Sequence, residues 1–176
     1  MELLSKATLA RLRDQLRERG RRPSMVMLDA SAMTPEAIQL VRFVSDFGPL
    51  CEAMYLMMSA DGLVGNDERE VLKGALRNLT YGEIRSHHIE AMLDLAAKVM
   101  GEFGREARIE AVVEELRADP ARAEVAFVLA AAVAFTDDRI ADAENELLNR
   151  FAEGLGIDVD RANELLDMAE ADLAEH

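Results

Sequence analysis

Hydrophobic positions along the chain recur at intervals of three and four residues, the spacing that places side chains on one face of an α-helix. Leu50, Ala53, Met54, Met57 and Met58 follow this pattern and predict a helix that faces the core. Residues 125–135 are apolar on every side, which predicts a helix at the centre of the domain. We therefore expect an all-α, single-domain bundle of about eight or nine helices.

Residues that favour helix ends divide the pattern into elements. Thr34-Pro35 and Asp119-Pro120 each place a capping side chain before a proline, which predicts that a helix starts there. Gly48-Pro49 predicts that a helix stops. Thr80 and Glu83 have the spacing of a capping box, which predicts a long helix at about 82–101.

One acidic stretch occurs twice, and the rest of the chain is arranged around it. Residues 61–68 recur as 137–144, and each copy follows an apolar helix and opens another. The sequence thus predicts two helix–acidic loop–helix repeats, at about 50–79 and 124–155. The matched positions are Asp61 with Asp137, Val64 with Ile140, Asn66 with Asp142, and Glu68 with Glu144.

The repeats predict how the core is built. Helices that follow one another in a repeat normally bury their apolar faces together. We expect Asn66 and Asp142 to cap the second helix of each repeat. We also expect a pseudo-twofold axis through a core bundle made of helices 50–60, 66–79, 124–136 and 142–154.

Each acidic loop resembles the latter half of an EF-hand calcium loop, with an acid, a β-branched residue and a final Glu. The ligand positions before each Asp hold Met57 and Ser59 in the first copy, and Val133 and Phe135 in the second. Neither loop alone can therefore be a complete calcium site. If the axis brings the loops together, carboxylates from both could bind Ca²⁺ or another divalent cation, which would neutralise their repulsion. The candidate ligands are Asp61, Glu68, Asp137 and Glu144, with Asn66 and Asp142 as outer contributors.

A structural interpretation explains the same residues. Glu68 and Glu144 fall in first helical turns, where acids complement the helix dipole. Asp61-Gly62 is a favourable turn pair, and Val64 and Ile140 could anchor the loops to the core. The sequence leaves both interpretations open.

Paired Ala-Asp-Gly-x-Val/Ile-x-x-x-Glu loops in an all-helical domain of this size resemble the tellurite-resistance protein TerB and its relatives. The resemblance covers about residues 36–173, within a TerB-like domain at 34–176. It implies an all-α fold, an acidic metal-binding surface and a role in metal or tellurite stress near membrane-associated complexes. No catalytic activity comes with the family. The second copy departs from the pattern, because Thr136 and Asp138 replace Ala and Gly.

Charge divides the chain into a basic arm and an acidic body. The net charge is −14, which argues against nucleic acid as a partner. Residues 1–22 carry seven basic and three acidic side chains, so the remainder has a balance of −18. Residues 1–33 are expected to be a helical arm at 2–19 and a connection. The arm either packs on the body or contacts an acidic partner or anionic lipid through Arg11, Arg13, Arg17, Arg19, Arg21 and Arg22.

The remaining signals limit the class of protein. The single Cys51 excludes a disulfide scaffold and is expected to be a buried small hydrophobe. His87 and His88 are adjacent, so a helix should point them in different directions. The longest apolar run is too short to span a bilayer, and no signal peptide is visible. The expectation is a non-enzymatic, cytoplasmic accessory protein that could associate with the periphery of the inner membrane. The sequence does not identify its protein partner or its oligomeric state. The alternative is a purely structural, acidic protein–protein interaction module without metal, similar to a co-chaperone or to an adaptor of a membrane complex.

Overall fold

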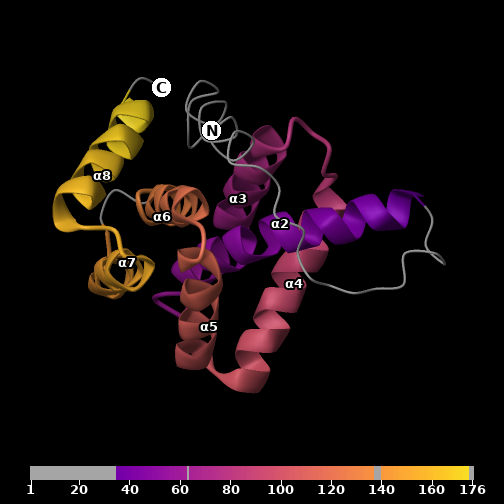
Figure 1. Ribbon diagram of the computed structural model, residues 1–176, viewed down its shortest axis with the longest axis horizontal. Helices are drawn as coiled ribbons and strands as arrows, with labels where there is room; N and C mark the ends of the chain where they lie inside the picture. The colour runs from indigo at the N-terminus through magenta and orange to yellow at the C-terminus, as the bar shows by residue number, and fades with distance from the viewer. Residues whose placement is uncertain (1–34, 63, 137–139, 175–176) are drawn as a thin grey trace.

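The computed structural model describes residues 35–62, 64–136 and 140–174, and within these ranges all the regular secondary structure is helical (Figure 1). The all-α prediction is confirmed. The described ranges hold seven helices, and the predicted arm helix at 2–19 lies outside them. The pseudo-twofold axis stays a prediction. The helices are α2 (Pro35–Met58), α3 (Asn66–Leu79), α4 (Ser86–Phe103), α5 (Arg105–Arg117), α6 (Pro120–Ala134), α7 (Asp142–Leu155) and α8 (Val159–Ala174).

Helix α6 is the centre of the fold, as its apolar run predicts. Twelve of its fifteen residues are buried, and it packs against α2, α5, α7 and α8. Its start follows from the sequence. Asp119 Oδ1 accepts hydrogen bonds from the backbone N–H groups of Ala121 (3.1 Å) and Arg122 (3.4 Å), and Pro120 occupies the first turn.

Helix α2 does not stop at Gly48-Pro49, so that prediction is wrong. The helix is continuous from Pro35 to Met58 with Pro49 inside it. A proline inside a helix leaves the carbonyl four residues earlier without its donor. Arg122 supplies the missing donor, because its Nη2 lies 3.4 Å from the Ser45 carbonyl and 2.8 Å from the Asp46 carbonyl. A side chain from α6 thus allows the helix to continue past the proline.

The predicted capping box at Thr80 is also wrong, because Thr80 ends α3 instead of starting α4. The Thr80 hydroxyl donates to the Arg77 carbonyl at 3.2 Å. The Gly82 N–H donates to the same carbonyl at 2.8 Å, with Gly82 at a φ of 73°. This closure satisfies carbonyls at the end of α3. The next helix therefore begins only at Ser86.

The core differs from the predicted four-helix set. The most extensive packing joins α2 to α6 and α2 to α4, and α5 also packs on both α2 and α6. Helix α3 is peripheral and contacts α2 only slightly. Its apolar face is still buried in the core through Leu72, Leu76 and Leu79. Ion pairs also join it to α4: Arg69 contacts Glu90 (3.2 Å) and Asp94 (2.9 Å), and Lys73 contacts Glu90 (2.5 Å). The sequence repeat does not predict that α4 and α5, more than α3, cover α2. The repeat carries no information on which helices pack against α2.

Candidate functional site: two acidic loops and an apolar groove

The first acidic loop is a tight turn at the end of α2. The Gly62 N–H donates to the Ser59 carbonyl at 3.1 Å, and Gly62 has a φ of 85°, a conformation that favours glycine. Asp61 is exposed beside it, and Val64 packs against the core. The predicted turn and the predicted anchor are both present in this copy.

The glutamates that end the two loops perform the same local task. Glu68 Oε2 accepts the Gly65 N–H at 2.7 Å, and Glu144 Oε2 accepts the Ala141 N–H at 2.8 Å. Each is the reciprocal half of a capping box, in which the third helical residue reaches back to the N-cap.

The assignment of Asn66 and Asp142 as caps is wrong by one position. Both are the first residues of their helices, and the N-caps are Gly65 and Ala141. Neither N-cap has a side-chain oxygen. The glutamate therefore supplies the side-chain half of each cap, and this explains why the acid recurs at this place in both copies.

An arginine donates hydrogen bonds to the backbone carbonyls that precede the first loop. Arg105 Nη1 lies 2.6 Å from the Ser59 carbonyl and 3.3 Å from the Ala60 carbonyl, and its Nη2 lies 3.0 Å from the Leu56 carbonyl. A positive side chain at the C-terminal end of a helix complements the dipole. It also takes the carbonyl oxygens that a hard cation would use as ligands.

The second loop has a different entrance. Thr136 closes the end of α6 by donating its hydroxyl to the carbonyls of Val133 (2.5 Å) and Ala132 (3.4 Å). Ile140 is 38% exposed, so the predicted anchor does not bury its side chain as Val64 does. Asp137 lies outside the described residues.

The predicted four-carboxylate site is therefore only partly visible. Asp61, Glu68 and Glu144 are placed, and Asp137 is not. Within the described ranges, no group of three or more His, Cys, Asp or Glu side chains could hold a metal ion. The convergence of the two loops on a cation stays a prediction.

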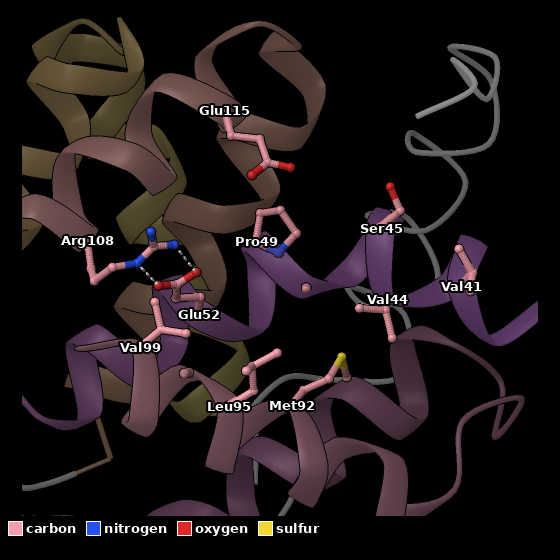
Figure 2. Close-up of a pocket in the computed structure, with 12 residues that line it drawn as sticks. Val41, Val44, Ser45, Pro49, Glu52, Met92, Leu95, Val99, Arg108 and Glu115 are labelled. Atoms are coloured by element: carbon pink, nitrogen blue, oxygen red, sulfur yellow. Dashed lines mark hydrogen bonds and ion pairs between the residues drawn. The ribbon is translucent and has the colours of Figure 1, made fainter. Parts of the chain in front are cut away.

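A separate hollow lies between α2, α4 and α5, and we call it the α2/α4/α5 groove (Figure 2). Its volume is about 610 Å³. Val44 from α2 and Met92 and Leu95 from α4 face the open space from opposite sides (Figure 2). Val44 is 39% exposed and Leu95 is 53% exposed, which leaves apolar surface in contact with water. The lining is Val41, Val44, Ser45, Gly48, Pro49, Glu52, Met92, Leu95, Ala96, Val99, Arg108 and Glu115.

One end of this groove carries a fixed ion pair. Arg108 Nε lies 2.7 Å from Glu52 Oε1, and Arg108 Nη2 lies 2.9 Å from Glu52 Oε2 (Figure 2). Hydrogen bonding to Glu52 raises the pKa of Arg108 above its ordinary value. Glu115 from α5 also lines the groove, so the lining contains two carboxylates and one guanidinium. The polar end of the groove is therefore net negative.

The remaining candidate residues are one cysteine and two adjacent histidines. Cys51 is buried, and burial raises the pKa of its thiol to about 12, as expected for a small core side chain. The rings of His87 and His88 lie 3.9 Å apart, so the expectation that they point apart is wrong. Burial, followed by the charges of His87 and Arg85, lowers the pKa of His88. Both residues lie in the first turn of α4, and neither is among the residues that line the groove.

Sequence reasoning missed the three arginines that contact α2. Arg122 donates to carbonyls in the turn before Pro49, and Arg108 forms an ion pair with Glu52. Arg105 donates to carbonyls at the C-terminal end of α2. They come from α5 and α6, far along the chain. The one signal available was Pro49 itself, because a proline in an otherwise helical apolar pattern requires a donor from elsewhere.

Comparisons with known proteins leave the TerB resemblance untested. A scan against family models found no match, and searches of curated proteins and of solved structures found no similar protein. Over the described part of the chain, no helix is both long and apolar enough to cross a membrane. The six arginines assigned to partner or membrane contact, between Arg11 and Arg22, lie outside the described residues.

Proposed function

We propose that the protein is a non-enzymatic interaction module that binds a basic, amphipathic helix of a partner protein in the α2/α4/α5 groove. The observation that carries this proposal is the pair of half-exposed apolar walls, Val44 and Leu95, at a hollow of about 610 Å³. Helix-in-groove recognition uses such walls to receive side chains at helical spacing. Of the two functional expectations from the sequence, this is the interaction module without metal.

The shape of the groove favours a helix as occupant. Its lining residues on α2 run from Val41 to Glu52, about three turns or roughly 17 Å. The residues on α4 run from Met92 to Val99, about two turns or roughly 11 Å. A partner helix lying along α2 could insert two or three apolar side chains between these walls.

Charge favours a basic occupant. Glu52 and Glu115 outnumber Arg108 at the polar end of the groove, and the chain beyond the arm carries a balance of −18. Complementary charge accelerates association and selects against acidic partners. The ion pair also fixes Arg108, which leaves Glu115 as the groove carboxylate with which a partner's Lys or Arg could pair.

The groove is tested with a designed peptide of about fourteen residues that places leucines on one helical face and lysines on the other. Its binding is followed by fluorescence anisotropy. Leu95→Gln should weaken binding about tenfold, because it removes an exposed apolar wall without changing charge. Val159→Gln is the matched control, since Val159 is 75% exposed on α8.

Two control peptides separate groove binding from general attraction to an acidic protein. A scrambled peptide has the same composition without the apolar face, and a leucine–glutamate peptide has the opposite charge. Both should bind weakly. Equal binding of the ordered and scrambled peptides, or an unchanged affinity in Leu95→Gln, would contradict the proposal.

Cation binding is the other candidate function. The difference between the two acidic loops favours the second loop, residues 137–144, as the place where a cation would bind. Arg105 holds carbonyls before the first loop, whereas the described residues before the second loop are closed by the uncharged Thr136. A TerB-like role in metal or tellurite stress would require this loop to bind a divalent ion. Calorimetry with Ca²⁺, Mg²⁺, Mn²⁺ and Zn²⁺, repeated on Asp137→Ala and Glu144→Ala, tests it. Absence of heat for all four ions would remove it.

A further inference from the structure

The chain itself contains a segment with the chemistry that the groove would select. Residues 2–19 place leucines at partial helical spacing, and arginines lie around them. This segment and the next three residues carry seven basic and three acidic side chains. The leucines are Leu3, Leu4, Leu9, Leu12 and Leu16.

We propose that residues 2–19 are the resident occupant of the α2/α4/α5 groove, so that the chain blocks its own binding site until a partner displaces the arm. The proposal rests on the proposed function, because it assigns an occupant to the same groove. It adds a regulatory step: a partner helix must compete with the chain's own arm.

The connection is long enough for the arm to reach the groove. Residues 20–34 separate the arm from Pro35, the first residue of α2, and an extended connection of that length spans up to roughly 50 Å. The groove follows α2 from Val41 onward, within a few turns of the attachment point. An eighteen-residue helix would be roughly 27 Å long, which exceeds the roughly 17 Å of lining on α2.

Tethering favours the arm over a free ligand. A segment joined by a short flexible connection has an effective concentration of the order of millimolar. Even a weak affinity of a few apolar side chains for the groove would then keep the site mostly occupied. The acidic balance of the body and the basic balance of the arm act in the same direction.

A nitroxide label next to the groove tests whether the arm lies there. The label is attached at Lys98→Cys in a Cys51→Ala background of the full chain. Lys98 is exposed on α4 between the groove residues Leu95 and Val99. The label should broaden the amide signals of residues 2–19 strongly. A label at Val159→Cys on α8, which packs on α6, should leave the same signals sharp.

The arm variant Leu12→Gln/Leu16→Gln removes part of the leucine stripe and changes no charge. It should abolish the broadening from the Lys98→Cys label. Unchanged arm signals in the wild-type arm, or equal broadening from both labels, would overturn the proposal. Broadening that appears only between chains, in a mixture of isotope-labelled and spin-labelled protein, would assign the groove to a second copy and also overturn it. So would arm signals that respond only to vesicles containing phosphatidylglycerol.

The same arm variant distinguishes this inference from the proposed function. Releasing the arm should tighten binding of the leucine–lysine peptide about tenfold, because the competent fraction rises. Peptide binding that is equally tight in both forms overturns the arm as a competitor and leaves the groove function intact. Strong broadening of the arm with no peptide binding, even by the arm variant, overturns the groove function and supports an internal contact.

Discussion

The two helix–acidic loop–helix segments share a sequence pattern but have different surroundings. Helix α6, the first helix of the second segment, is covered on all sides by α2, α5, α7 and α8. Helix α2, the first helix of the first segment, has only slight packing from its own partner α3 and leaves a face open at the groove. The repeated part of α2, from Leu50 to Met58, is buried like α6, so the open face lies mainly on the earlier part of α2, from Pro35 to Pro49.

The difference extends to how each first helix satisfies its carbonyls. In α6 a hydroxyl from the helix end, Thr136, closes the last turn. In α2 two arginines from other helices donate these hydrogen bonds. Arg122 donates to carbonyls in the turn before Pro49, and Arg105 donates to carbonyls at the C-terminal end. Two distant charged side chains thus complete the backbone hydrogen bonding of α2.

Replacing Arg105 with Met should destabilise the protein the most. Three carbonyls at the end of α2 would lose a charged donor, and hydrogen bonds to charged groups are worth enough for a total loss of about 3 kcal/mol. Urea unfolding followed by circular dichroism gives the free energy of unfolding. The control is Arg117→Met, an exposed arginine in the last turn of α5. Equal losses in both variants would show that Arg105 does not hold the first loop.

Arg122 and Pro49 should be energetically coupled. Arg122→Met leaves the Ser45 carbonyl without a donor and removes the charged donor to the Asp46 carbonyl, and it should cost about 2 kcal/mol. Pro49→Ala restores a backbone N–H, so the same Arg122 substitution should cost about 1 kcal/mol less in that background. A double-mutant cycle by urea unfolding measures the coupling. Strict additivity would contradict the account of why α2 continues past its proline.

The two loop anchors should differ in their contribution to stability. Val64→Ala removes methyl groups that pack against the core and should cost about 1 kcal/mol. Ile140→Ala removes more carbon from a side chain that is 38% exposed, and should cost only about 0.5 kcal/mol. Thermal unfolding of both variants under the same conditions compares them. A larger loss for Ile140→Ala would mean that the second loop is anchored like the first.

The two loop glutamates should be equivalent. Glu68→Ala and Glu144→Ala each remove the acceptor from an N-cap N–H and should each cost about 0.5–1 kcal/mol. Glu170→Ala, an exposed position on α8, is the control. The measurement is the melting temperature with and without Ca²⁺. A capping role predicts similar losses that do not depend on the cation, whereas a ligand role predicts that Ca²⁺ stabilises the wild type and neither variant.

Features set by neighbours in sequence could be predicted from the sequence, and features set by distant side chains could not. The Asp119-Pro120 start and the bounds of α3 follow from local preference and periodicity. The continuation of α2 depends on Arg122, seventy-three residues beyond Pro49. Thr80 is a residue type that favours helix starts, but its hydroxyl donates to the Arg77 carbonyl and so closes the end of α3.

The candidate sites show the same division. The position of Glu68 and Glu144 in first helical turns was predictable, because it depends on three neighbouring residues. The groove was not, because it exists only where α4 and α5 leave part of α2 uncovered. The periodicity of apolar residues within α2 does not predict that neighbouring helices leave Val44 partly exposed.

The most direct test of the central claim is a map of backbone amide chemical shifts during titration of the full chain with the leucine–lysine peptide. The account predicts that the shifts gather at Val41–Glu52, Met92–Val99 and Arg108–Glu115, the segments that line the groove. Shifts confined to the acidic loops at 61–68 and 137–144, with the groove segments unchanged, would contradict it.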